Sequence, residues 1–71
     1  MKMAKTKVFI GNHLRMLRKE RNMKQKDVAD YLGISVAVYS SYETDTNEPP
    51  LSVIIGLAEL FETSTDNILD I

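Results

Sequence analysis

Few side chains of this sequence could take part in covalent or metal chemistry. His13 is the only histidine, and it lies in a basic stretch without an evident partner nearby in the sequence. The chain has no cysteine, which excludes a thiol nucleophile, a thiolate zinc site and a disulfide. The acidic residues do not show the dense ligand spacing of a calcium loop. Acid–base catalysis needs groups positioned together at one substrate, so the sequence predicts no enzyme, no metal site and no cofactor.

The charges are divided between the two parts of the chain. All nine lysines and arginines lie in residues 1–26, where Glu20 is the only acid, and the remaining acids follow from Asp27 onward. This asymmetry indicates a basic surface that could meet a polyanion and an acidic surface that faces away from it. The alternative is a dipolar protein whose charges are simply solvated.

The length of 71 residues predicts one small domain. Residues 1–7 are basic and lack apolar periodicity, so we expect a flexible basic N-terminal tail before a single domain over 8–71. No apolar run is long enough to span a membrane, and the N-terminus lacks the apolar region of a secretory signal. These features predict a soluble cytoplasmic protein without a membrane partner.

Apolar residues at helical spacing predict an all-α, compact five-helix bundle. In the first helix, for example, Ile10, Leu14 and Leu17 lie on one face, and Asn22 can adopt the left-handed conformation that ends it. Gly33 can end the second helix for the same reason, and Ser35 is a suitable N-cap for the third. The predicted helices cover 8–21, 25–32, 36–43, 51–62 and 65–71.

The second and third predicted helices and the turn between them resemble those of the phage-repressor and Cro-type (XRE-type) helix-turn-helix family. The resemblance extends from about Ile10 to Leu69 and implies a lambda-repressor-like DNA-binding domain. It also implies a sequence-specific transcriptional regulator, repressor-like, that binds double-stranded operator DNA as a homodimer. The residues that carry the resemblance are Arg18, Gln25, Ala29, Gly33, Ser35, Tyr39, Tyr42, Glu43, Pro49, Ala58 and Phe61.

The resemblance also implies a role for individual residues. Arg18 would form a structural ion pair with Glu43, and the third helix would lie in the major groove. The residues implied in base contacts are Ser35, Val36, Ala37 and Ser41, with Ser40 beside them, and those implied in phosphate contacts are Lys24, Gln25, Lys26 and Thr44. The basic tail would be either a flexible DNA-binding arm or a solvated end.

The sequence departs from the family at the positions that would read DNA. Relatives commonly carry long polar side chains where this chain has Val36, Ala37 and Ser41, and such side chains make bidentate base contacts. Valine and alanine can contact a thymine methyl group, so direct readout would be sparse and would depend on T-rich steps and DNA shape. Asp45 and Glu48 also place two acids near the expected phosphate track.

The fourth helix carries a second apolar stripe formed by Val53, Gly56 and Leu60. A helix that is apolar on most sides is usually covered on both faces. Either the chain covers this stripe itself, or the stripe is a dimer interface, or it docks a missing C-terminal domain or another protein partner. In the last case the alternative function is a helix-turn-helix scaffold that acts mainly as a protein-interaction module, such as an antitoxin or adaptor subunit.

Overall fold

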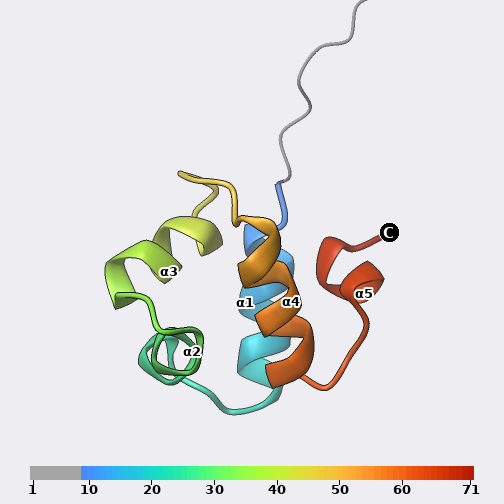
Figure 1. The fold of residues 1–71 in the computed structure, drawn as a ribbon, viewed down its shortest axis with the longest axis horizontal. Helices are drawn as coiled ribbons and strands as arrows, with labels where there is room; N and C mark the ends of the chain where they lie inside the picture. Colours follow the sequence, from blue (N-terminus) through green and yellow to red (C-terminus); the bar gives the residue numbers. More distant parts are fainter. Residues whose placement is uncertain (1–8) are drawn as a thin grey trace, which may run out of the picture.

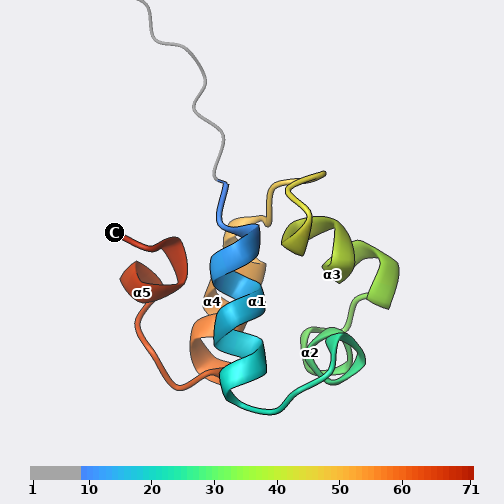
Figure 2. The ribbon, with the colours of Figure 1, turned by 180° about the vertical axis from the view of Figure 1, so that it is seen from behind.

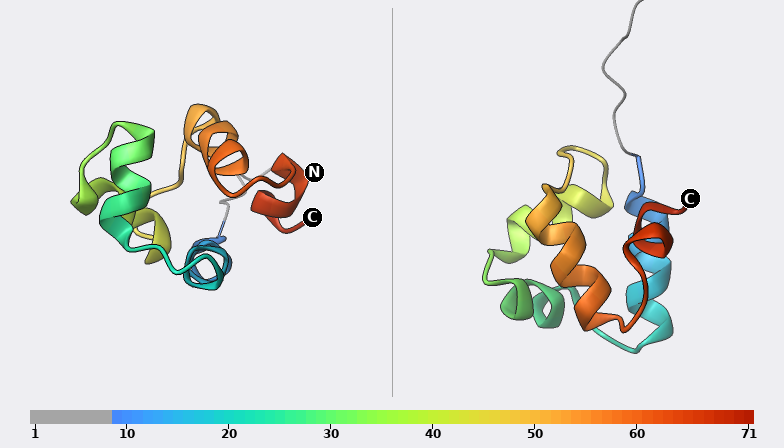
Figure 3. Two further views of the ribbon diagram at one scale, coloured as in Figure 1. Left: turned by 90° about the horizontal axis from the view of Figure 1, so that it is seen from below. Right: turned by 45° about the vertical axis from the view of Figure 1, so that its right-hand side comes forward.

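Five α-helices surround one apolar core in the computed structural model, which describes residues 9–71. α1 and α4 lie on opposite sides of the core, α2 and α3 close one end, and α5 closes the other (Figures 1 and 3). The predicted all-α fold is confirmed, whereas the predicted basic tail lies outside the described residues. The helices are α1 (Gly11–Glu20), α2 (Gln25–Leu32), α3 (Val36–Glu43), α4 (Leu51–Leu60) and α5 (Thr65–Leu69).

Every helix contributes to the core at least one side chain without any exposed surface. These residues are Leu14, Val28, Tyr39, Leu57 and Ile68. They are the apolar positions that helical spacing assigned to the inner faces, because burial of apolar surface is the main favourable contribution to folding. In residues 9–71 no helix combines the length and the apolar character needed to cross a membrane.

Several helix ends differ from the sequence-based expectation. α1 begins at Gly11 rather than Val8, and the Asp45 carboxylate accepts a hydrogen bond from the Gly11 N–H group at 3.0 Å. This contact comes from a residue far along the chain, so local spacing could not predict it. α4 ends at Leu60 rather than Glu62, because Glu62 takes a left-handed conformation with φ of 55°. α5 ends at Leu69 for the same reason, with Asp70 at φ of 61°.

The turn between α2 and α3 forms as the sequence predicts. Gly33 has φ of 71°, a conformation that glycine adopts without steric cost. The Ser35 hydroxyl then caps α3 by accepting a hydrogen bond from the Val38 N–H group at 3.1 Å. At the start of α2 the Asp27 carboxylate accepts a hydrogen bond from the Lys24 N–H group at 2.9 Å.

The last residue of α3, Glu43, is buried and connects three helices. Its carboxylate accepts two hydrogen bonds from the Arg18 guanidinium of α1, at 2.6 and 3.0 Å. It also accepts one from the Gln25 side-chain amide of α2, at 3.0 Å. The expected ion pair between Arg18 and Glu43 is therefore present, and we call Glu43, Arg18 and Gln25 the Glu43 cluster. The cluster fixes α3 against both preceding helices.

The electrostatics of the Glu43 cluster follow from burial and hydrogen bonding. Burial raises the pKa of the Glu43 carboxyl, but the hydrogen bonds from Arg18 and Gln25 outweigh it and hold the pKa below the ordinary value of 4.5. The hydrogen bond to Glu43 raises the pKa of Arg18 in turn. The adjacent Tyr39 hydroxyl is buried without a hydrogen-bond partner of good geometry among the described residues, and burial raises its pKa well above the usual range.

The start of α1 lies against the end of α3, as Figure 2 shows from behind. A Cβ atom added to Gly11 would lie 2.2 Å from the Glu43 carbonyl oxygen, closer than any real contact allows. Gly11 is therefore required for the close approach of these two helices. Together with the Asp45 cap, it places the loop after α3 directly over the start of α1.

Two side chains, one in α1 and one directly after it, attach the C-terminal half of the chain. His13 Nε2 donates a hydrogen bond to the Asn67 carbonyl oxygen of α5 at 2.6 Å. Arg21 donates to the Phe61 carbonyl oxygen at 2.9 Å, and its guanidinium carbon lies 5.0 Å from the centre of the Phe61 ring. These two basic residues therefore act within the fold.

The first prediction concerns the energy of the Glu43 cluster. Glu43→Leu and Arg18→Met are each expected to lower the free energy of unfolding by about 3–5 kcal/mol, because each leaves a buried charge unpaired. The free energy of unfolding of the double variant is expected to fall by much less than the sum of the two single losses, because neither charge remains. Urea unfolding measures this, with Lys26→Ala as a nearly neutral control that breaks only the exposed pair with Asp30. Additive losses would contradict the prediction.

The second prediction concerns pH. Since the Glu43 pKa is lower in the folded than in the unfolded chain, its stabilisation is fully present above the ordinary value of 4.5 and is lost as pH falls through the folded pKa. The difference in free energy of unfolding between the wild-type chain and Glu43→Gln is therefore expected to shrink below about pH 4.5. Urea unfolding at several pH values tests this; a constant difference down to about pH 3 would show that Glu43 does not titrate as described.

Candidate nucleic-acid interface

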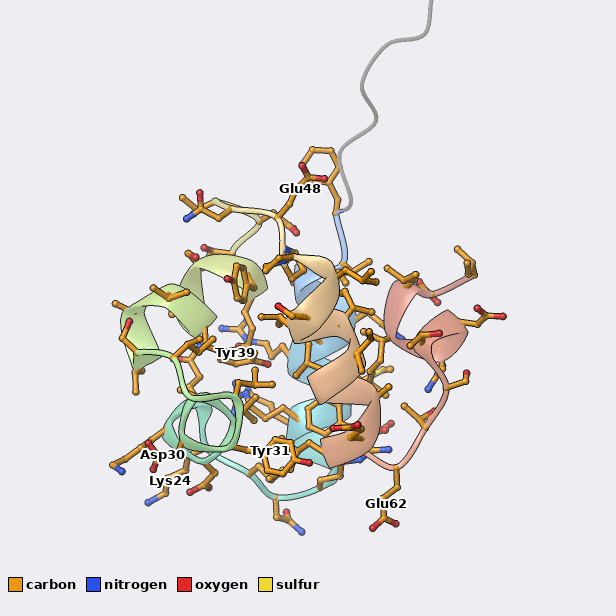
Figure 4. The ribbon with its side chains drawn as sticks, viewed as in Figure 1. Lys24, Asp30, Tyr31, Tyr39, Glu48 and Glu62 are labelled. Atoms are coloured by element: carbon orange, nitrogen blue, oxygen red, sulfur yellow. The ribbon has the colours of Figure 1, made fainter. Side chains whose placement is uncertain are left out.

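The outer face of α3 is exposed and consists of small or apolar side chains. Val36 and Val38 are 41% and 42% exposed, and Ala37 between them is also exposed. The opposite face is buried through Tyr39, which points into the core (Figure 4), and through Tyr42. The first turn of α3 therefore presents three apolar residues to whatever lies against it.

The hydroxyl groups of α3 are partly used within the helix. The Ser35 hydroxyl accepts the capping hydrogen bond described above, and the Ser41 hydroxyl donates to the Val38 carbonyl oxygen at 2.6 Å. The Thr44 hydroxyl lies 3.3 Å from the Ser41 carbonyl oxygen and 2.8 Å from the Thr46 hydroxyl. Ser40 is half-buried. Ser35 therefore retains its O–H donor, and Ser41 retains acceptor lone pairs, for contact with a ligand.

Of the three predicted phosphate-binding residues at the start of α2, two already have partners inside the protein. Gln25 is half-buried and donates to Glu43, as part of the Glu43 cluster. The Lys26 ammonium donates to the Asp30 carboxylate at 2.8 Å, and this hydrogen bond raises its pKa. Lys24 is exposed and has no side-chain partner among the described residues. The α2 end thus offers one cation without a side-chain partner in residues 9–71 and two groups that already hold one internal hydrogen bond each.

The half-buried Asp45 side chain contacts the start of α1. It has φ of 61°, a conformation that usually selects glycine or asparagine, and its carboxylate is held by the Gly11 N–H group. This negative charge at the positive end of α1 is favourable for the helix dipole. The acid therefore has a structural role at α1.

Three residues at the contacts between α1 and the end of α3 were not assigned these roles from the sequence. Arg15 lies on the α3 side of α1, with a side chain that is 57% exposed and Nε 4.0 Å from a Glu43 carboxylate oxygen. Its spacing of three residues before Arg18 could have indicated a shared helix face. Gly11 and Asp45 could not have been identified in this way, because their roles depend on a contact between distant segments.

The apolar stripe of α4 is covered by the chain itself. Val53 is buried, Leu60 packs against the core, and a Cβ atom on Gly56 would lie 2.6 Å from a methyl group of Leu32 in α2. Of the alternatives given above, the structure favours coverage of this stripe by the chain itself, and a dimer contact through it stays a prediction. The exposed apolar side chains of α4 are instead Leu51 and Ile55, at 71% and 44%.

Ligand pockets and metal sites each have a characteristic geometry. No pocket is present in residues 9–71, and no group of three histidine, cysteine or acidic residues there is arranged to hold a metal ion. The candidate site is therefore an open surface formed by α3, the start of α2 and the adjacent face of α1.

Known proteins resemble this chain in sequence and in fold. It is 38% identical over 56 residues to the uncharacterized HTH-type transcriptional regulator YobD of Bacillus subtilis, covering 79% of this chain and 50% of YobD. It is 38% identical over 58 residues to the HTH-type transcriptional regulator AnsR of the same organism, covering 82% and 50%. The chain thus spans about half the length of these relatives. They are named as transcriptional regulators and not as enzymes, which agrees with the sequence-based expectation.

A solved structure of the P22 c2 repressor protein in complex with synthetic operator 9T shares the fold. The TM-score is 0.77 at 23% sequence identity, and the match covers 84% of this chain and 91% of the repressor chain. The helix-turn-helix family model matches residues 14–68, which include α2, the turn at Gly33 and α3. The resemblance inferred from the sequence is confirmed, and the chain belongs to the helix-turn-helix family.

Proposed function

We propose that this chain is a sequence-specific, repressor-like transcriptional regulator that binds operator DNA as a homodimer, with α3 in the major groove. The observation that carries this proposal is the contrast between the two faces of α3. Its inner end is fixed by the Glu43 cluster, while its outer face and first turn are open. In helix-turn-helix proteins the first residues of the second helix contact base edges. The names of the relatives and the operator in the P22 complex support the same function.

The charge distribution supports this orientation. Lys24 at the start of α2 and Arg15 on the α3 side of α1 are both exposed, and Lys19 lies one turn after Arg15 on the same helix. Glu62 lies at the opposite side of the molecule, below α5 (Figure 4). A duplex against α3 would therefore meet cations, and phosphate contacts supply much of the affinity of DNA-binding proteins.

The remaining predicted contacts form part of the same proposal. Gln25 and Lys26 each hold one hydrogen bond, to Glu43 and Asp30, and would contact phosphates through their remaining N–H donors. Lys24 has no such internal partner among the described residues, so we assign it the larger share of the affinity. Ser35, Val36, Ala37, Ser40 and Ser41 would face the bases, and Thr44 would lie near the backbone.

A homodimer would place two copies of α3 about one DNA turn apart. Leu51 and Ile55 lie one helical turn apart on α4, and a second copy of the chain would remove both from water. An isologous twofold contact uses the same patch on both subunits. We therefore assign the dimer contact to this exposed pair rather than to the buried stripe.

A second candidate function is a helix-turn-helix scaffold that binds a protein. The exposure of Val36, Ala37 and Val38 favours this candidate, because contiguous exposed apolar residues often mark interaction surfaces. The same residues would then dock a protein partner instead of a duplex. The two candidates differ in their requirement for phosphate, which salt dependence measures.

Selection of sites from a random duplex library tests the function. We expect an enriched site with twofold symmetry, and an affinity that falls linearly with salt concentration on a logarithmic plot. Binding without enrichment that vanishes near physiological salt would favour the protein-interaction candidate.

The third prediction assigns a phosphate contact to Lys24. Lys24→Ala is expected to weaken binding to selected and unrelated duplexes alike, and to reduce the salt slope by about one. Glu62→Gln changes the net charge by one unit in the opposite sense and on the opposite side of the molecule, and it is expected to leave the slope unchanged. Affinities measured at several salt concentrations compare the two variants; an unchanged slope for Lys24→Ala would remove this contact.

The fourth prediction concerns the dimer. Leu51→Asp, alone or with Ile55→Glu, is expected to shift the protein from dimer to monomer in sedimentation experiments, because a charge replaces apolar contact area. Aspartate suits the first position of α4, so the fold is expected to persist. Met16→Glu, which charges an exposed apolar residue of α1, provides the matched control. Equal dimer dissociation constants in all variants would show that the dimer contact lies elsewhere.

A further inference from the structure

We propose that α3 recognises the C5-methyl groups of pyrimidines, so that 5-methylcytosine can replace thymine as the base that it reads. The inference rests on the proposed DNA-binding function and specifies the chemistry of its ligand. It follows from the polar groups that α3 lacks and from the apolar groups that it exposes.

The helix has no side chain available for a bidentate hydrogen bond to a base. Within residues 35–46, only Glu43 and Asp45 carry two polar atoms suited to such a contact. The Glu43 carboxylate accepts its hydrogen bonds within the Glu43 cluster. The Asp45 carboxylate accepts a hydrogen bond from the Gly11 N–H group at the start of α1. Discrimination by paired donors and acceptors, the usual basis of direct readout, is therefore closed to the side chains of α3 itself.

The exposed part of α3 is suited to apolar contact instead. Val36 and Val38 flank Ala37 in the first turn of α3. In helix-turn-helix proteins, the first turn of the second helix of the motif contacts the bases. A valine in a helix has one strongly preferred rotamer, so its methyl groups are presented at fixed positions. The first turn of α3 therefore forms a rigid apolar surface.

In the major groove the only apolar group of an unmodified base pair is the C5-methyl group of thymine. Against a valine, the donors and acceptors of the other bases would lose water without gaining a hydrogen bond, which is unfavourable. Methylation of cytosine at C5 places the same group on a C·G pair. An apolar reader would therefore respond to that modification as it responds to thymine.

The test begins with the selected duplex and replaces each thymine in turn by deoxyuridine, which lacks only the methyl group. At the positions that face α3, Kd is expected to rise about fourfold for each methyl group removed. At the same positions, a 5-methylcytosine·guanine pair is expected to bind about fourfold more tightly than cytosine·guanine. Both effects are expected to weaken in Val36→Ala, whose exposed position and helix-favouring residue preserve the fold.

The outcomes separate this inference from the function on which it rests. Two outcomes with an enriched site would overturn the inference and leave the function standing. In the first, the affinity does not change when deoxyuridine replaces thymine. In the second, the affinity changes with deoxyuridine but not with cytosine methylation. Methyl effects that persist unchanged in Val36→Ala and in Val38→Ala would overturn the assignment to α3. Met16→Ala serves as the control for loss of an exposed apolar side chain. Absence of any enriched site would overturn both proposals.

Discussion

The arrangement of the helix-turn-helix depends on one buried carboxylate. Glu43 ends α3 and is held by Arg18 from α1 and Gln25 from α2. Removing a carboxylate from water is unfavourable unless hydrogen bonds and an opposite charge compensate, so Glu43 requires both neighbours in place. This requirement fixes α3 at its inner end. The outer face has no such constraint and is free for a ligand.

Internal hydrogen bonds, including those of the Glu43 cluster, occupy several of the basic side chains. The basic N-terminal part of the chain suggests a continuous cationic surface, but Arg18, Arg21 and Lys26 have partners inside the protein. Among residues 9–71, the exposed cations without a close side-chain partner are Lys19 and Lys24. If the chain binds DNA, its electrostatic attraction comes from a small number of positions, and the apolar first turn of α3 supplies the base contacts.

The loop after α3 illustrates how one acid can be compatible with a polyanionic ligand. Asp45 would repel phosphate if it pointed outward, but it caps α1 through the Gly11 N–H group. Gly11 has room for this contact only because it lacks a Cβ atom. One close approach of two helices thus engages the Asp45 carboxylate at the start of α1.

The sequence by itself determined the number, type and order of the helices, because apolar periodicity and the turn residues Gly33 and Ser35 are local signals. It also indicated the pairing of Arg18 with Glu43, through a resemblance to a known family. Tertiary structure decided which polar groups remain available, since the partners of Gln25, Asp45 and Arg21 lie far away in the sequence. It likewise decided that Val53 and Gly56 are internal, because burial depends on how α2 packs against α4. Spacing along one helix identifies an apolar face but not what covers that face.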